Sequence, residues 1–153
     1  MSGTGHTVKS YEEEMQSLND NLVKMGSLTE NQLADAMEAV IKVDKESVDK
    51  IVKSDSKINE LRSIIDNQIT TVLVKRAPMA VDLRMTISTM KISHDLERIG
   101  DLAKSVAKKV KPLPVDLPSE LISSLRRLGD LVQKQLKEVL DAYLNREKEK
   151  AVE

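Results

Sequence analysis

Apolar residues recur every three, four or seven positions along most of this chain, and proline interrupts the pattern in only two places. Such spacing puts the apolar side chains on one face of an α-helix, so it predicts amphipathic helices. The interruptions are Pro78 and the segment 111–118, which holds the other three prolines. Helices of roughly 30 residues, about 45 Å long, joined by short turns predict an all-α fold, an up-and-down bundle. The most β-rich run, Ile69–Val74, continues the helical spacing and does not favour a strand.

Local signals predict where the helices begin and end. The expected helices span residues 10–43, 45–75, 78–109 and 118–148. Ser10 followed by Glu13 fits a capping box at the first start, and Asp44 can cap the second helix. Pro78 suits the first turn of the third helix, where its missing N–H is not needed. Residues 1–9 show no periodicity and are expected to form a disordered tail.

Composition narrows both the core and the range of functions. Aromatic residues make up only 1% of the chain, so the core must be built from aliphatic side chains and methionine, which suits helix-on-helix packing. There is no cysteine, which excludes disulfides and thiolate metal sites. The net charge is −1, whereas nucleic-acid binding needs a clustered basic surface. The polar N-terminus does not resemble a secretory signal and no apolar run approaches the roughly 20 residues of a membrane span, so we expect a cytoplasmic protein.

The last predicted helix repeats the sequence of the first at a constant offset. Seven residues are identical at that offset: Leu18, Leu22, Gly26, Leu28, Gln32, Leu33 and Ala39 correspond to Leu121, Leu125, Gly129, Leu131, Gln135, Leu136 and Ala142. Chance similarity between two amphipathic helices could align the leucines, but the shared mid-helix glycine favours an internal duplication. Residues 10–110 would then form a complete three-helix unit, 111–118 a linker, and 119–153 the first helix of a second unit. The uncovered apolar face of that last helix predicts self-association, most simply a homodimer.

The third predicted helix carries a pair of carboxylates one turn apart. Glu97 and Asp101 continue an apolar row of that helix and would be stacked roughly 6 Å apart at Cβ. Two like charges at that distance repel, and a divalent or trivalent cation bound between them would relieve the repulsion. The alternative is that the pair faces solvent, with Arg98 and Lys104 nearby. His94 lies in the same row and is either a further ligand or an ordinary core or surface histidine.

Asp55 is a second unusual carboxylate, because it interrupts the apolar row of the second helix between Ile51 and Ile58. A buried carboxylate without a partner is costly. It therefore needs a metal ion, exposure at the edge of the row, or a salt bridge, for which Arg76 and Arg84 are the candidates.

Arg76 and Arg84 also flank the expected start of the third helix, where free backbone N–H groups favour anions. This arrangement indicates a phosphate site, or else both arginines pair with Asp82 or Asp55. No Glu-x-x-His pair, His-Glu-x-x-His motif, Gly-rich phosphate loop or Gly-x-Ser-x-Gly motif occurs. With two histidines and no cysteine, no nucleophile–base pair is evident either, so no enzyme activity is predicted.

Two segments of the third predicted helix, RAPMAVDLR at 76–84 and DLERIGD at 95–101, resemble the signature segments of the PhoU family. The residues that carry the resemblance are Arg76, Pro78, Ala80, Asp82, Leu83 and Arg84, then Asp95, Leu96, Glu97, Arg98, Ile99, Gly100 and Asp101. The family is built of two three-helix units. The resemblance therefore implies one complete PhoU-like repeat and a fourth helix that opens another, and it extends over residues 11–110 and 121–153.

The resemblance also implies metal ligands. Family members share Glu/Asp-x-x-x-Asp motifs that can hold multinuclear metal clusters. Glu97 and Asp101 match one such motif, and Asp55 begins the other. The neutral Asn59 stands where the family usually has a second acid. Divalent or ferric metal ions are the implied cofactors.

The function implied by the resemblance is negative regulation of phosphate uptake and of phosphate-starvation signalling. The family accompanies bacterial phosphate-uptake transporters and acts by contact with the transporter ATPase subunit and a sensor histidine kinase. Such a protein would reach the inner membrane only through these partners, and no catalytic step is implied. The alternative is a metal-binding helical bundle with a storage or catalytic role, against which the missing Glu-x-x-His motifs weigh.

Overall fold

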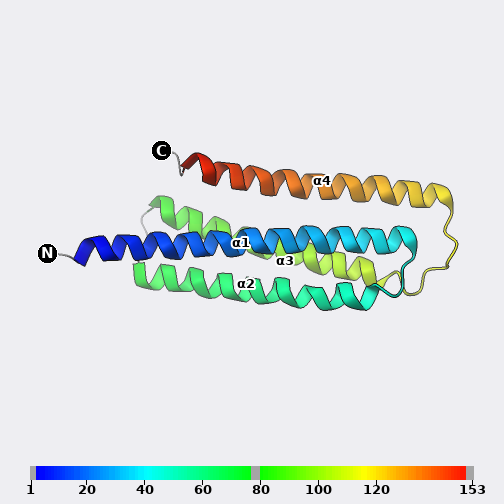
Figure 1. Ribbon diagram of the computed structural model, residues 1–153, viewed down its shortest axis with the longest axis horizontal. Coiled ribbons are helices and arrows are strands. Elements are labelled where there is room, and N and C mark those ends of the chain that lie inside the picture. The colour runs from blue at the N-terminus through cyan, green and yellow to red at the C-terminus, as the bar shows by residue number, and fades with distance from the viewer. Residues whose placement is uncertain (1–2, 77–79, 151–153) are drawn as a thin grey trace.

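The computed structural model is a bundle of four long helices in which successive helices run in opposite directions (Figure 1). The structure describes residues 3–76 and 80–150, and the side chains of residues 10–75 and 83–145. The helices are α1 (Gly3–Lys42), α2 (Val48–Arg76), α3 (Ala80–Lys108) and α4 (Ser119–Lys150). These two ranges contain no strand, so the prediction of an all-α bundle is confirmed. None of the helices described is both long enough and apolar enough to cross a membrane.

The start of α1 corrects one expectation. A disordered tail was expected over residues 1–9 and a capped helix start at Ser10, but α1 already begins at Gly3. Adding residues to an existing helix needs no new nucleation step. A well-packed helix can therefore extend into neighbouring residues that show no helical periodicity of their own. The expected start of the third helix at Pro78 lies outside the described residues, and α3 is described from Ala80.

The corner between α1 and α2 is fixed by backbone geometry and by one carboxylate. Val43 has φ 51°, and the hydrogen bonds from its N–H to Val40 O and from Asp44 N–H to Ala39 O end α1 as a Schellman motif. Asp44 Oδ1 then accepts hydrogen bonds from the backbone N–H groups of residues 46 and 47, at 3.1 and 3.2 Å. Hydrogen bonds from Ser47 lower the pKa of Asp44. Asp44 is therefore a cap, as predicted, but of the turn that precedes α2.

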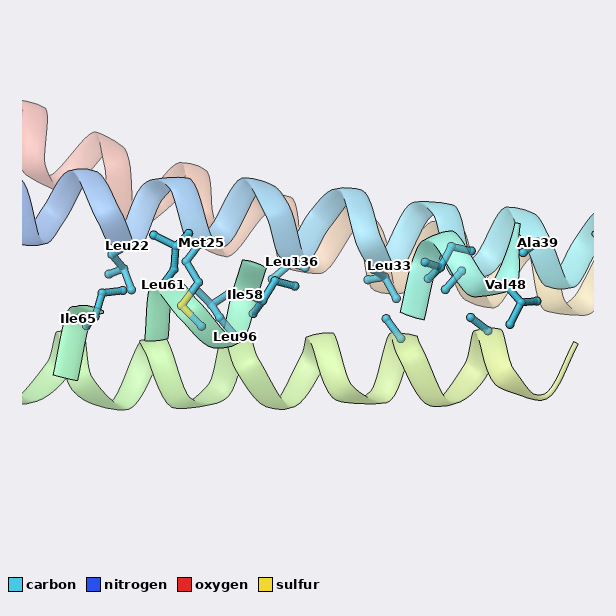
Figure 2. Packing of buried hydrophobic residues seen from close by; sticks show 14 of the residues in the cluster. Leu22, Met25, Leu33, Ala39, Val48, Ile58, Leu61, Ile65, Leu96 and Leu136 are labelled. Carbon is cyan, nitrogen blue, oxygen red and sulfur yellow. The ribbon is translucent and has the colours of Figure 1, made fainter. Parts of the chain in front are cut away.

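The core is aliphatic and lies where α1, α2 and α3 meet (Figure 2). Its largest fully buried apolar side chains come from the rows seen in the sequence: Leu18, Leu22, Met25, Val48, Ile58, Ile65, Val72 and Val110. Helix α1 packs against each of the other three helices, whereas α4 packs against α1 alone among the elements described. Because α1 is the shared element, it must present apolar or small residues on two opposite faces.

Two glycines bring α1 and α4 together, and the contact is nearly symmetric. A Cβ added at Gly26 would lie 2.9 Å from Leu140 Cδ2, and one added at Gly129 would lie 2.7 Å from Met37 Cε. The offset that relates Gly26 to Gly129 also relates Met37 to Leu140. Each helix therefore inserts the same side-chain position beside the glycine of the other, as in a two-fold symmetric interface. Any antiparallel pair of helices is reciprocal in this way, because the residue numbers of contacting positions have a constant sum. The internal duplication therefore stays a prediction, and the structure adds that both repeated glycines lie at the close approach of the two helices.

Gly26→Leu should separate α4 from α1, because the new side chain would occupy the space that Leu140 now fills. Amide hydrogen exchange would then show loss of protection along α4, while α2 and α3 keep theirs. Lys24→Leu is the matched control, since it adds the same side chain to the same helix at an exposed position. Equal protection of α4 in the two variants would contradict the close approach.

Candidate functional site

The predicted site residues lie where α2 and α3 pack on α1. Asp55 of α2 is 3% exposed, as its place in an apolar row requires. Gly100 lets α3 approach it: a Cβ there would lie 3.0 Å from Ile58 Cδ1 and 3.5 Å from Asp55 Oδ1. The family-like glycine is therefore a packing residue that brings the α3 backbone beside a buried carboxylate.

Asp55 is held by donors from all three helices of the unit. Gln32 Nε2 of α1 donates to Asp55 Oδ1 at 2.9 Å and also to Gly100 O at 2.9 Å. Asn59 Nδ2 donates to Asp55 Oδ2 at 3.1 Å, and Lys104 Nζ donates to the same oxygen at 2.5 Å. The salt bridge considered from sequence is thus present, and its cation is Lys104, which was not one of the candidates. A buried carboxylate with this many donors is fully satisfied.

Lys104 also joins the two helices of the site. Its Nζ lies 2.5 Å from Asp101 Oδ1 as well as from Asp55, so one ammonium bridges a carboxylate of α3 and a carboxylate of α2. Hydrogen bonds to Asp101 and to Asp55 raise the pKa of Lys104. The stabilisation from a raised lysine pKa is complete below the unfolded value near 10.5 and is lost only as the pH rises through the folded pKa. The bridge therefore operates throughout the physiological range.

Glu97 and Asp101 form ion pairs with different side chains. Glu97 Oε1 lies 3.1 Å from Arg62 Nη1 of α2, whereas Asp101 pairs with Lys104. His94, a candidate ligand from sequence, is half-exposed, and its Nε2 lies 3.4 Å from Asp66 Oδ1 and 3.4 Å from Arg62 Nη2. The structure thus divides the predicted acidic row into two ion-pair clusters.

The geometry does not suit a metal ion. Within the ranges described, no group of three or more His, Cys, Asp or Glu side chains is placed to hold one. Each of the three carboxylates predicted as ligands already faces a cationic side chain of the chain itself. The amides beside Asp55, those of Gln32 and Asn59, turn N–H groups toward it, and these repel a cation.

The remaining signature residues serve different purposes. Asp95 and Arg98 are exposed on α3, and Arg84 is exposed near the start of that helix. The side chains of Arg76 and Asp82, and the whole of Pro78, lie outside the described residues. The phosphate site considered near the start of α3 therefore stays a prediction.

Sequence reasoning missed Gln32 and Arg62 and considered Lys104 only as a surface neighbour. A signal was available for Gln32, because it recurs as Gln135 in the helix that repeats the sequence of α1, and because it interrupts an apolar row of α1. Lys104 follows Asp101 by three residues, which places both on one helix face. Its reach across to α2 could not be deduced from the spacing of α3 alone.

Comparison with known proteins identifies the family. The family model for the PhoU domain matches residues 22–110, which include the α3 segment 95–101. The chain belongs to the PhoU family. The resemblance to the family is thereby confirmed, and the residues of the Asp55 network all lie within the matched range.

Three relatives show how far the similarity extends. A PhoU homolog of Caulobacter vibrioides, named a phosphate-specific transport system accessory protein, is 40% identical over 150 residues, which are 97% of this chain and 65% of that protein. A protein of the same name from Clostridium acetobutylicum is 35% identical, over 96% of this chain and 68% of that protein. The crystal structure of PhoU from Pseudomonas aeruginosa superposes with a TM-score of 0.79 at 34% identity, over 88% of this chain and 65% of that one. The chain thus spans about two thirds of the length of these PhoU proteins.

Gln32→Leu should destabilise the fold by roughly 1–3 kcal/mol, because Asp55 and Gly100 O would each lose a buried donor. The free energy of unfolding can be measured in urea by far-UV circular dichroism. Gln135→Leu is the control that the duplication provides: the equivalent residue of α4 is exposed, so its change should stay within about 0.5 kcal/mol. Similar losses in both variants would show that the Asp55 network is not what Gln32 stabilises.

Proposed function

We propose that this chain is a negative regulator of phosphate uptake and of phosphate-starvation signalling that acts by protein–protein contact. The observation that supports this most directly is its place in the PhoU family, whose relatives from two bacteria are named accessory proteins of a phosphate-specific transport system. An accessory role needs a surface and not a reaction centre. The ion pairs of Asp55, Glu97 and Asp101 are internal to the chain and suit such a role.

The partners in this proposal are the phosphate transporter ATPase subunit and a sensor histidine kinase. Contact with them would hold the protein at the inner membrane from the cytoplasmic side. The polar face of α3 is the surface we propose for this contact, because Asp95 and Arg98 are signature residues that are exposed and so do not serve the core. Fold alone would constrain the buried Gly100 of the same segment but not these two side chains.

The metal-storing or catalytic bundle considered as an alternative gains no support from the site. It would need free carboxylates, whereas Glu97 is paired with Arg62 and Asp101 with Lys104. A role in nucleic-acid binding is not proposed, because the chain carries 24 basic and 25 acidic residues and no net basic charge.

Deletion of the gene should raise phosphate uptake and derepress phosphate-starvation genes in phosphate-rich medium. The wild-type chain should restore repression, whereas Arg98→Glu should not, because it reverses an exposed charge on the proposed contact surface. Transcription from a starvation-responsive promoter and a pull-down against the transporter ATPase and the sensor kinase measure the two effects.

The control for Arg98→Glu is Lys53→Glu, which makes the same charge change at an exposed position of α2. Circular dichroism should show that both variants keep the bundle. Unchanged phosphate-responsive transcription in the deletion strain would reject the regulatory role. Recovery of neither partner by the wild-type chain would reject the proposed mode of action.

We also propose that the chain forms a homodimer through α4. The helix has an exposed apolar row, and the row continues on the side away from α1: Leu121, Leu128, Leu131, Val132 and Val139 are 38–66% exposed. The α1 equivalents of Leu121 and Leu128 are Leu18 and Met25, both fully buried. The row thus corresponds to a core-facing surface. Leu136 of the same helix is not part of this exposed row, because it is buried in the core cluster.

Sedimentation velocity should show association that depends on protein concentration, since apolar rows of this kind usually mark contacts. The double change Leu128→Lys, Leu131→Lys should shift the protein toward monomer by placing charges in the row. Leu102→Lys is the control, because Leu102 is an exposed leucine of α3 outside this surface. A wild-type chain that remains monomeric at high concentration would contradict the proposal.

A further inference from the structure

A single ammonium group holds the place between α2 and α3 where the sequence predicted a metal ion. Lys104 Nζ lies 2.5 Å from Asp55 Oδ2 and 2.5 Å from Asp101 Oδ1, which is the position of a cation shared by two carboxylates. We propose that Lys104 is the resident cation of this site, and that α2 and α3 of this chain are joined there without a metal ion.

The charges around the site support an ammonium in preference to a metal ion. Asp55 and Asp101 share one positive charge from Lys104, and the nearby Glu97 is neutralised separately by Arg62. Glu97, which a multinuclear metal cluster would need as a ligand, is instead paired with Arg62. Each of the three carboxylates predicted as ligands therefore already has a cationic side chain within ion-pair distance.

The hydrogen bonds around Asp55 also favour an ammonium group over a metal ion. Gln32 Nε2 donates both to Asp55 Oδ1 and to Gly100 O, so the Gln32 side-chain oxygen is turned away and accepts from Ser54 at 2.7 Å. A hard divalent cation takes six or more oxygen ligands. At the position of Lys104 Nζ the two carboxylates would supply the oxygens, while the neighbouring amides of Gln32 and Asn59 present hydrogens.

An ammonium in this position has a structural consequence for the unit. It is covalently part of α3, one turn beyond Asp101, so the bridge to α2 forms whenever the helices pack and does not depend on the supply of a metal. The Lys104 side chain is 23% exposed, so its stem lies along the α2–α3 boundary and its charged end reaches inward to the buried Asp55. The packing of α3, which carries the proposed contact surface, is then insensitive to metal availability.

The first test is metal dependence of the wild-type chain. Elemental analysis should find far less than one metal ion per chain, and the melting temperature should be the same in EDTA and in millimolar manganese chloride. A stoichiometric metal content, or a melting temperature that falls in EDTA, would overturn the proposal.

The second test is a double-mutant cycle. Lys104→Met removes the charge but keeps much of the stem, so it should lower the melting temperature by roughly 6–20 °C through the uncompensated Asp55 carboxylate. Adding Asp55→Asn to that variant removes the buried charge and should recover part of the loss. Lys108→Met, one turn further along α3 and exposed, is the matched control and should change little.

The cycle decides between a cation role and a packing role for Lys104. If Asp55→Asn lowers the melting temperature of the Lys104→Met protein further, the lysine acts through its stem and the proposal fails. If Lys104→Met alone does not fold, the double variant still decides, because the proposal requires that it folds.

Discussion

The buried carboxylate of Asp55 constrains the rest of the unit. A charge that is 3% exposed must be neutralised and hydrogen-bonded, or the helices that enclose it do not pack. Gln32 of α1 and Lys104 of α3 donate to it from the two neighbouring helices, and Asn59 donates from its own helix, α2. Apolar rows can slide past one another by a turn at modest cost, but Gln32 and Lys104, which come from other helices, meet Asp55 in one register only. The polar network thus specifies an alignment that an aliphatic core alone leaves loosely determined.

Helix α1 packs against the other three helices through two of its faces. One face carries the core residues and Gln32, and the other carries Gly26 against Leu140 of α4. Because the contact of Gly129 with Met37 repeats that of Gly26 with Leu140, the two related helices meet through the same surface of each. In α4 most of the surface equivalent to the core face of α1 is exposed, although Leu136 is buried. An apolar row therefore shows which face of a helix can be buried, but whether that face is buried depends on the helices that pack against it.

The sequence predicted the helices well because their signals are local. Apolar spacing and proline set the type and approximate ends of all four, and the break between Asp44 and Val48 follows from a capping residue. The start of α1 was wrong because cooperative extension of a helix leaves no residue-level signal. Asp55 was correctly singled out by its place in an apolar row, but its cation was not. Helical spacing gives the neighbours of a residue on its own helix, whereas the partner Lys104 depends on how α2 and α3 align.

The α3 signature combines two kinds of constraint. Gly100 is fixed by close packing against Ile58 and Asp55, and any chain that buries this carboxylate beside α3 needs a small residue there. Asp95 and Arg98 meet no such requirement, since both are exposed. Glu97 and Asp101 lie between these extremes: they are partly buried, and they pair with Arg62 and Lys104. When the acidic groups of a segment form ion pairs within the chain, the charges available at its surface are mainly those that are exposed. On α3 these exposed charges include Asp95 and Arg98. The structure thus separates the residues that align the helices from those available for contact.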